Sequence, residues 1–372
     1  MSLYIGLMSG TSMDGVDATL VQFSDQKISV IQSCTTPYPG KLRAQLGKAI
    51  APGARLSLHD IGTFNVSIGR AFAKAAQAIL KQTETQASQV VAIGSHGQTL
   101  RHSPESDPPY SIQLGDPATI AYRTSITTVA DFRAIDIASG GQGAPLVPAF
   151  HDAWFRVAGK DIVIVNIGGI ANITALPAKP SDPIAGFDAG PGNCLLDDWI
   201  SKVRQLSCDQ DGLWAASGSV CDRLLGRLMK DKHILRTPPK STGREYFNLK
   251  FLEDILEQTG TLNLKPEDIQ ATLLEYTVTS IVHGIQQTGI SAKQVYVCGG
   301  GAQNGMLMSR LRASLPGSSV TSTAERDIEP GAVEAVAFAW LARQRLNLRP
   351  VRVTTGPRTL NHILGTVCVP TI

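Results

Sequence analysis

The stretch Ile162–Phe187, "IVIVNIGGIANITALPAKPSDPIAGF", indicates how this chain of 372 residues folds. It holds three apolar, strand-like runs in direct succession, at Ile162–Ile167, Asn172–Leu176 and Ile184–Phe187. The links between them are too short for helices, so we expect them to pair as neighbouring strands. The same order occurs near the N-terminus, at Leu3–Met8, Ala18–Phe23 and Ile28–Cys34. The sequence therefore predicts one structural unit that is used twice.

Helical patterns follow both triplets, and further single strands lie between them. The clearest helical patterns are Leu58–Leu80, Asn193–Arg204, Ser219–Met229, Pro266–Thr288, Asn304–Leu315 and Val333–Leu346. The single strands are expected at Val90–Ser95, Ile126–Phe132, Val295–Cys298 and Ser319–Ser322. Strands that alternate with helices of this length indicate an α/β fold with largely parallel sheets.

Two domains with a ligand cleft between them follow from the doubled unit. The glycines and proline of Gly140–Pro145 interrupt regular secondary structure, so we expect this segment to connect the two halves. We predict one domain from residues 1–135 plus 347–372 and a second from residues 136–346. The helix Val333–Leu346 would carry the chain back toward the first half.

Composition excludes several classes of protein. Hydrophobic residues make up 43% and charged residues 17%, as in a globular chain, and the net charge of +3 comes from scattered basic residues that leave no nucleic-acid footprint. The six cysteines form no CxxC pair, which disfavours a zinc site or a disulfide framework. No apolar run reaches the roughly 20 residues of a membrane span, and Met1–Ile5 resembles no export signal. We expect a cytoplasmic protein with small-molecule partners, without nucleic acid or membrane.

The turn after the first strand has the composition of a phosphate site. It contains Gly10, Thr11, Ser12, Met13, Asp14, Gly15, Val16 and Asp17. Glycines and hydroxyl groups suit an anion-binding backbone turn. Asp14 and Asp17 suit a hydrated Mg²⁺, which takes one or two carboxylates and keeps several waters. The alternative is a hairpin turn in which Asp is only a turn former; the sequence is not a Walker A loop.

A second glycine-rich turn follows the strand Val295–Cys298. Gly299, Gly300 and Gly301 precede the helix Asn304–Leu315, an arrangement that lets backbone approach a ligand at a helix N-terminus. The spacing does not match the dinucleotide fingerprint. We favour a nucleotide contact over the plainer interpretation of a tight turn.

One aspartate stands apart in "GFDAGPGN", residues 186–193. We expect Asp188 at the end of a short strand, in a tight turn, where open α/β sheets place ligands. Its carboxylate either caps the turn or does chemistry. Neither GxSxG nor HExxH occurs, and phosphoryl transfer requires positioning, electrostatics and a base. Asp188 is therefore the candidate base.

Other polar residues have both a functional and a plain interpretation. Ser95–Thr99 offers donors and acceptors suited to a polyol, although His96 alone is more simply a satisfied turn histidine. Arg133 holds an anionic group or pairs with Asp131 or Asp136. Glu334, in the first turn of its helix, is more simply a partner of the helix dipole.

Five blocks of sequence resemble the anhydro-N-acetylmuramic acid kinases. These are Gly6–Asp17, Gly94–Thr99, Asn166–Asn172, Gly186–Asn193 and Gly299–Asn304. The resemblance runs in order from residue 5 to about residue 342 and covers nearly the whole chain. One mild departure is Ala189, where this family more often has threonine.

The resemblance implies a two-domain, actin-like and ribonuclease H-like ATPase fold of the superfamily that includes sugar kinases and heat-shock proteins, closing over ATP. It also implies that ATP, Mg²⁺ and water convert 1,6-anhydro-N-acetylmuramic acid to N-acetylmuramic acid 6-phosphate and ADP during peptidoglycan recycling. A homodimer is expected from the family alone.

The resemblance also implies roles for individual residues. Asp188 is the expected catalytic base, and Glu334 becomes a second carboxylate of the sugar pocket rather than a dipole partner. Gln98, Thr99 and Arg133 would hold the sugar. Gly10–Asp17 would hold phosphates with Mg²⁺ near Asp14 and Asp17, while Gly168, Gly169 and Asn172 face them from the other domain, and Gly299–Gly301 flank the adenosine.

Two alternatives remain open at this point. One is a different sugar or carboxylate kinase on the same scaffold, which would share the phosphate turns and differ in its acceptor pocket. The other is a nucleotide-driven conformational module. ATP turnover that depends on a sugar separates an enzyme from such a module.

Overall fold

The computed structural model describes residues 1–10, 13–24, 27–51, 53–355 and 360–370. Two compact units divide the chain, one formed by Met1–Phe150 with Ala332–Ile372 (unit 1) and the other by His151–Gly331 (unit 2). The α/β fold expected from the sequence is confirmed. The predicted boundaries differ, because residues 136–150 and 332–346 belong to unit 1 and not to the second domain.

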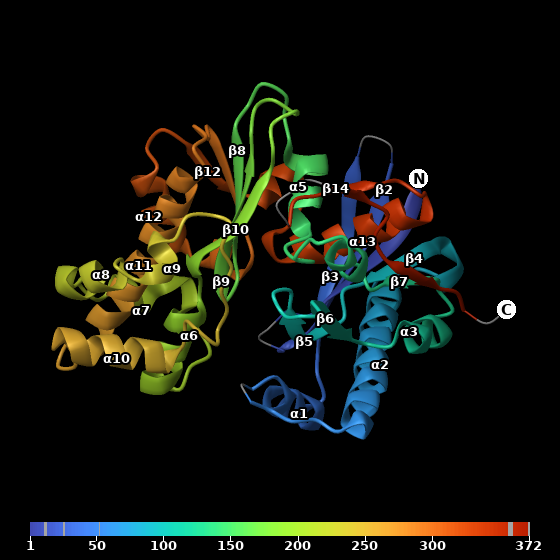
Figure 1. Ribbon diagram of the computed structural model, residues 1–372, viewed down its shortest axis with the longest axis horizontal. Coiled ribbons are helices and arrows are strands. Elements are labelled where there is room, and N and C mark those ends of the chain that lie inside the picture. The colour runs from blue at the N-terminus through green and yellow to red at the C-terminus, as the bar shows by residue number, and fades with distance from the viewer. Residues whose placement is uncertain (11–12, 25–26, 52, 356–359, 371–372) are drawn as a thin grey trace. The chain divides into compact units, whose positions relative to one another are not determined.

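Unit 1 is built on a six-stranded sheet with the order β15-β7-β4-β1-β2-β3 (Figure 1). Its strands are β1 (Ser2–Met8), β2 (Gly15–Phe23), β3 (Ile28–Pro37), β4 (Val90–Ser95), β7 (Thr128–Ala130) and β15 (Thr366–Cys368). The first three strands pair antiparallel in chain order, and β4 and β7 extend the sheet parallel to β1. The predicted three-strand opening of the first unit is confirmed.

Helices cover both faces of this sheet. They are α1 (Gly40–Ile50), α2 (Leu58–Gln82), α3 (Pro117–Thr124), α4 (Ala134–Ala138) and α13 (Val333–Leu346), with α5 (Val147–Phe155) at the boundary between the units. Ile5 and Leu7 of β1 share a buried cluster with Phe72 of α2. The residue between them, Gly6, points to the opposite face and meets α13.

The close fit of α13 explains why this helix belongs to unit 1. A Cβ atom on Gly6 would lie 1.7 Å from the carbonyl oxygen of Ala335, and one on Gly94 would lie 2.0 Å from that of Phe338. Only glycine allows the helix backbone to lie directly on the strand backbone. The boundary predicted at residue 346 would instead place this helix in the second domain, because the sequence does not reveal that the two glycines lie directly under the helix.

Unit 2 repeats the opening with a five-stranded sheet of order β10-β9-β8-β11-β12 (Figure 1). Its strands are β8 (Ile162–Ile167), β9 (Ile170–Leu176), β10 (Ala185–Pro191), β11 (Gln294–Cys298) and β12 (Ser319–Ser322). The strands β8, β9 and β10 pair antiparallel, and β11 and β12 continue parallel to β8. The predicted second copy is confirmed.

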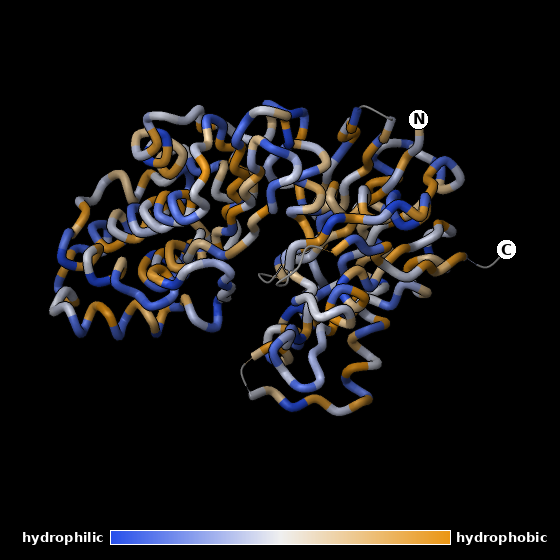
Figure 2. The backbone as a smooth tube through the Cα atoms, turned by 45° about the horizontal axis from the view of Figure 1, so that its top comes forward, coloured by the Kyte–Doolittle hydropathy of each residue, from blue (hydrophilic) through white to orange (hydrophobic). Residues whose placement is uncertain are grey.

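The helices of unit 2 enclose one large buried cluster. They are α6 (Cys194–Arg204), α7 (Leu213–Ala216), α8 (Asp222–Leu228), α9 (Lys232–Leu235), α10 (Leu249–Thr259), α11 (Pro266–Gln287) and α12 (Gly305–Ser314). The sequence patterns did not predict α9 and α10, nor α1 and α3 of unit 1. Hydrophobic and hydrophilic residues alternate along most helices of the chain, as expected for helices with one face on a core (Figure 2).

Smaller elements complete the units. The strands β5 (Gln98–Ser103) and β6 (Tyr110–Leu114) form one two-stranded sheet, and β13 (Val351–Val353) and β14 (Leu360–His362) form another. Short 3-10 turns lie at Ala87–Gln89, Gln210–Gly212, Gly300–Gln303, Thr323–Arg326 and Pro330–Ala332. Among the helices that the structure describes, none is both long and apolar enough to cross a membrane.

Candidate active site

Three polar residues form a row across the strands of unit 2. Asn166 on β8 is the register partner of Asn172 on β9, and Asn172 is in turn the partner of Asp188 on β10. Register partners project to the same face of a sheet, so Asp188 and Asn172 share one face. Asp188 therefore lies within a strand that runs on to Pro191, next to an irregularity in register, and not in a turn after the strand as the sequence predicted.

Asp188 is held on its backbone and on its carboxylate. Its N–H donates to the carbonyl oxygen of Lys240 at 3.1 Å, and its own carbonyl oxygen accepts from Nε2 of His233 at 3.0 Å. The backbone N–H of Thr242 donates to Oδ2 at 2.9 Å. The segment from His233 to Thr242 thus fixes the position and orientation of this side chain.

The surroundings of Asp188 tune its proton affinity. The pKa of the Asp188 carboxyl is raised to about 7, and burial is the largest cause. The charge of Glu245 also raises the pKa, whereas the hydrogen bond from Thr242 and the charge of Lys240 lower it. A carboxylate with a pKa near the working pH is suited to act as a general base. The raised pKa is consistent with the predicted role of Asp188 as a base.

Lys240 is a structural neighbour that the sequence analysis missed. Its side chain is 4% exposed, and Nζ donates to the carbonyl oxygens of His233 and Ile234, each at 3.0 Å. Burial and, to a smaller extent, the charge of Arg236 lower its pKa, which is about 8. The available signal was the polar Lys240-Ser241-Thr242-Gly243 run after two prolines, but nothing in the sequence places that run beside residue 188.

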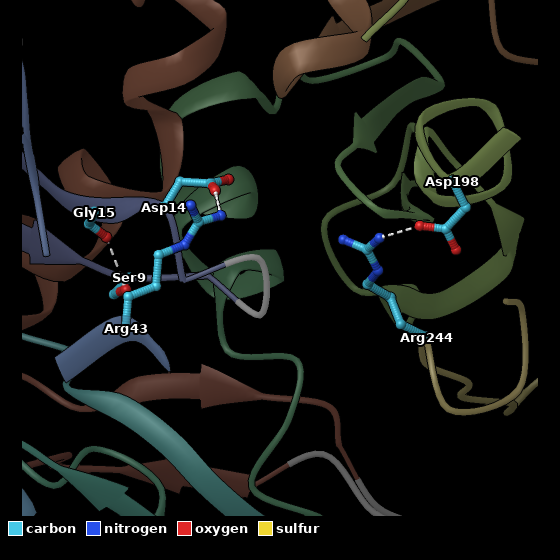
Figure 3. A network of polar contacts seen from close by, with 6 residues as sticks. All are labelled: Ser9, Asp14, Gly15, Arg43, Asp198 and Arg244. Carbon is cyan, nitrogen blue, oxygen red and sulfur yellow. Dashed lines mark hydrogen bonds and ion pairs between the residues drawn. The ribbon is translucent and has the colours of Figure 1, made fainter. Parts of the chain in front are cut away.

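The turn between β8 and β9 is tied to the segment that follows β10. The carbonyl oxygens of Gly168 and Gly169 accept from the backbone N–H groups of Asn193 and Gly192, at 2.8 and 2.9 Å. Beside this turn, Arg244 donates to Oδ1 of Asp198 at 2.7 Å, as the right-hand part of Figure 3 shows. A Cβ atom on Gly169 would lie 3.6 Å from Cδ of Arg244. The structure thus places a guanidinium group next to the predicted phosphate turn.

The glycine triplet has a packing explanation for two of its members. A Cβ atom on Gly299 would lie 2.4 Å from Oδ1 of Asn166, and one on Gly301 would lie 2.4 Å from Cγ2 of Ile167. Gly299 also has a φ of +78°, which favours glycine. Gly300 is exposed, and its lack of a side chain leaves open backbone before α12.

In unit 1, the side chain of Gln98 is hydrogen-bonded to the turn that follows β1. It is 2% exposed; its Oε1 accepts from the hydroxyls of Ser9 at 2.8 Å and Tyr38 at 3.3 Å, and its Nε2 donates to the carbonyl oxygen of Gly10 at 3.3 Å. The Ser9 hydroxyl also lies 2.8 Å from the carbonyl oxygen of Gly15, so its single proton is shared between that oxygen and Oε1 of Gln98 (Figure 3). Gln98 therefore stabilises the turn through Ser9 and Gly10, and Ser9 connects it to Gly15.

The residues of the first turn differ in accessibility. Asp14 is exposed and accepts from Nη2 of Arg43 at 2.5 Å (Figure 3). Asp17 is partly buried on β2, where its Oδ1 accepts from Thr35 at 2.6 Å, and burial raises its pKa. Val16 is fully buried in the core, so only its backbone can meet a ligand. Thr11 and Ser12 lie outside the described residues.

Glu334, Arg133 and Asp17 interact electrostatically in unit 1. Burial raises the pKa of Glu334, the charge of Asp17 raises it further and that of Arg133 lowers it. Arg133 donates to the carbonyl oxygen of Gly143 at 2.6 Å and to Nε2 of His96 at 2.7 Å. The structure therefore brings together three of the predicted site residues, and it commits two donors of Arg133 to internal partners.

Thr99 is the second residue of β5. It is half-buried on β5, where its Oγ1 accepts from Nε2 of Gln113 at 3.3 Å. His96 is buried, and its Nε2 accepts from Arg133, but its Nδ1 has no hydrogen-bond partner among the described residues, so the plain interpretation of a satisfied histidine holds for one ring nitrogen only.

Two α/β units that each open with three consecutive antiparallel strands have the duplicated architecture of the actin-like fold. The family follows from comparison with known proteins. The chain belongs to the anhydro-N-acetylmuramic acid kinase family, whose model matches residues 2–369.

Curated relatives with that name cover nearly the whole chain. The protein of Shewanella amazonensis is 50% identical over 98% of this chain and 98% of its own. Those of Variovorax paradoxus and Coxiella burnetii are both 45% identical and cover 97% and 98% of this chain, with 98% and 96% of their own length.

Solved structures show remoter similarity. The activator of the 2-hydroxyisocaproyl-CoA dehydratase from Clostridium difficile, with bound ADPNP, has a TM-score of 0.47 at 10% identity and covers 93% of this chain and 96% of its own. A ROK family glucokinase from Streptomyces griseus has a TM-score of 0.40 at 12% identity, with coverage of 92% and 100%.

Proposed function

We propose that this protein is an ATP-dependent kinase that opens 1,6-anhydro-N-acetylmuramic acid with water and phosphorylates O6. The products are N-acetylmuramic acid 6-phosphate and ADP, and the reaction serves peptidoglycan recycling. The observation that carries the proposal is the environment of Asp188, whose carboxylate is oriented by Thr242 and has a pKa of about 7. Membership of the kinase family supplies the substrate.

In the proposed reaction, Asp188 takes a proton from water through Oδ1, because Thr242 occupies Oδ2. The water oxygen forms a bond to C1 of the sugar as the bond from C1 to O6 breaks, and that electron pair passes to O6. O6 attacks the γ-phosphorus of ATP, the bond to the β-phosphate oxygen breaks, and ADP leaves. Asp188 then releases its proton to solvent.

The sugar would bind to residues of unit 1. Glu334 would offer an acceptor in electrostatic range of Asp17 and Arg133, and Thr99 would offer a hydroxyl group. Gln98 contributes by fixing Ser9 and Gly10. These assignments fit the observed bonds of each side chain.

ATP would bind to the glycine-rich turns, with Gly10–Asp17 and the group Gly168, Gly169 and Asn172 at the phosphates and Gly299–Gly301 at the adenosine. Asp14 and Asp17 would hold Mg²⁺ through water, and both use Oδ1 for their bonds to Arg43 and Thr35. An ion that takes only one or two carboxylates and keeps several waters would match these two side chains. When bound, Mg²⁺ neutralises charge on the β- and γ-phosphates.

We also propose that the protein works in the cytoplasm as a homodimer, as expected for the family. Light scattering on the purified protein measures the dimer directly, and a monomeric mass would contradict that part.

The test is the reaction in ¹⁸O-labelled water with wild type and Asp188→Asn. Wild type should place the label at C1 and none in the phosphate group. Asp188→Asn should lower kcat by about 10²- to 10⁴-fold, the usual contribution of a general base. Asp222→Asn, an exposed aspartate of α8, is the matched control and should keep full activity.

Two outcomes would contradict the proposal in different ways. If wild type leaves the anhydro sugar untouched but phosphorylates another acceptor, the substrate is wrong. If Asp188→Asn keeps full activity, Asp188 is a structural residue and the base lies elsewhere.

A further inference from the structure

A pocket of about 600 Å³ opens in unit 2 beside Asp188. His233 and Thr242 line it, and both donate hydrogen bonds to Asp188. A molecule in this pocket therefore lies directly against the groups that hold the proposed base. The volume is within the usual range for sites of small ligands.

Two cationic side chains line the same pocket, Lys232 at the start of α9 and Arg236 directly after its end. Both are exposed, and among the residues that the structure describes neither forms an ion pair. Lys232 lies over the ring of Tyr246, with Nζ 5.4 Å from its centroid. Arg236 is anchored through its backbone, because its carbonyl oxygen accepts from Nε2 of Gln287 at 3.2 Å. Its guanidinium group is free to meet a ligand.

The other arginines near the predicted site residues are already committed. Arg133 donates to His96 and Gly143, Arg244 to Asp198 and Arg43 to Asp14. Arg236 differs from them because only its backbone is engaged. Its charge is also in range of Lys240, whose pKa it lowers. An anion at Arg236 would offset the repulsion between these two cations.

Neutral donors accompany the charge. Ser241 and Thr242 place hydroxyl groups in the lining. Glu245 also lines the pocket, so an anionic ligand group must bind toward α9 rather than toward Glu245. A carboxylate matches this arrangement, because the planar guanidinium fork of arginine binds it through two parallel hydrogen bonds.

We propose that this pocket binds the carboxylate of the lactyl ether of the muramic acid substrate, with Arg236 as its principal partner. The inference rests on the proposed function and adds the basis of its specificity. The lactyl ether is the group that distinguishes a muramic acid from a glucosamine. Arg236 would thus select the sugar, while Asp188 acts on its anhydro bridge.

The experiment compares kcat/KM for three acceptors. These are 1,6-anhydro-N-acetylmuramic acid, its methyl ester, which keeps the lactyl bulk without the charge, and 1,6-anhydro-N-acetylglucosamine, which lacks the lactyl group. Each is measured with wild type, Arg236→Met, Arg236→Lys and the control Arg223→Met. Arg223 is exposed on α8 and does not line the pocket.

Wild type should prefer the free acid over both neutral sugars by about tenfold or more, the size expected for a charged hydrogen-bonded pair. Arg236→Met should reduce that ratio to near one by losing activity on the acid alone. Arg236→Lys should restore part of the ratio, and Arg223→Met should keep the wild-type ratio.

Several results would overturn the inference. One is an equal kcat/KM of wild type for all three sugars, and another is an equal loss of kcat/KM for all three in Arg236→Met. A third is that Arg223→Met loses the preference for the free acid as Arg236→Met does. If wild type phosphorylates none of the three, the proposed function itself fails and the inference falls with it. The two failures are distinct, because a wrong pocket leaves wild type active.

Discussion

The two units cover the same three-strand opening with a helix in different ways. In unit 1 the backbone of α13 lies on β1 and β4, where added Cβ atoms on Gly6 and Gly94 would meet carbonyl oxygens at 1.7 and 2.0 Å. In unit 2 the glycine is on the helix: a Cβ atom on Gly284 of α11 would meet Cδ1 of Ile173 at 2.6 Å and Cβ of Ala189 at 3.0 Å. Backbone cannot move aside, whereas an isoleucine side chain can. The first interface is therefore the less tolerant one.

This difference also governs how each unit positions a carboxylate. Glu334 precedes Ala335, the residue whose carbonyl lies against Gly6, so the close contact of α13 sets Glu334 near Asp17 and Arg133. Asp188 instead stands on the strand itself, next to Ala189, and a loop segment holds it. One carboxylate depends on helix packing and the other on hydrogen bonds.

The largest predicted effect comes from Gly6→Ala. Because the clash is with backbone, the helix must shift, and we expect unit 1 to lose about 3 kcal/mol or more, the upper end of overpacking effects. Hydrogen exchange of β1 and α13 peptides should accelerate strongly, while β8 and α11 peptides of unit 2 keep their protection. Gly47→Ala, on α1 with nothing within 4 Å of an added Cβ, is the control. Wild-type exchange in Gly6→Ala would contradict the described seat of α13.

The second prediction concerns pH. The proposed base works ionised, and burial raises the pKa of Asp188 to about 7. Below that pH, kcat/KM should fall by about tenfold per unit, since each unit lowers the ionised fraction tenfold. Initial rates from pH 5 to 9 measure this limb, and a flat profile below pH 7 would remove Asp188 from the role of base.

The same pKa makes a prediction about stability with the opposite dependence. A carboxyl whose folded pKa is raised stabilises the fold below its unfolded pKa of about 3.9 and loses that contribution as pH rises through about 7. Asp188→Asn should therefore melt above wild type at pH 8, and the difference should vanish near pH 4. Melting curves at both values test the sign.

Much of the fold was predictable from sequence because it depends on local patterns. The doubled strand triplet was visible as apolar runs with short links, and the long helix α2 was visible from its periodicity. The short helix α9 was missed because four residues are too few for a periodic signal. The placement of α13 was missed because Gly6 and Gly94 reveal their purpose only when the helix lies on them.

The residues of the candidate site were predictable from the sequence to a similar extent. Asp188 could be proposed from the sequence because a lone carboxylate among glycines is unusual. Lys240 and Thr242 were missed because they reach Asp188 across about fifty residues of chain. Arg236 was missed because an exposed arginine has no distinctive sequence context. Contacts of this kind depend on tertiary structure and leave little trace in a single sequence.

The smallest predicted effect is that of Gly284→Ala. The new methyl group displaces the end of the Ile173 side chain, which can rotate away, and meets the fixed Cβ of Ala189 at 3.0 Å, which requires a shift of only a few tenths of an ångström. We therefore expect a loss of about 1 kcal/mol, the lower end of overpacking effects. Part of this cost is offset by the better helix propensity of alanine. The control in the same unit is Gly226→Ala on α8, where an added Cβ meets nothing within 4 Å, and it should gain up to about 1 kcal/mol. Urea unfolding and hydrogen exchange of α11 and α8 measure both variants. The contrast between the units would not hold if Gly284→Ala lowered the free energy of unfolding as much as Gly6→Ala does. The side chains around Gly284 would then be as unable to move as the helix backbone beside Gly6.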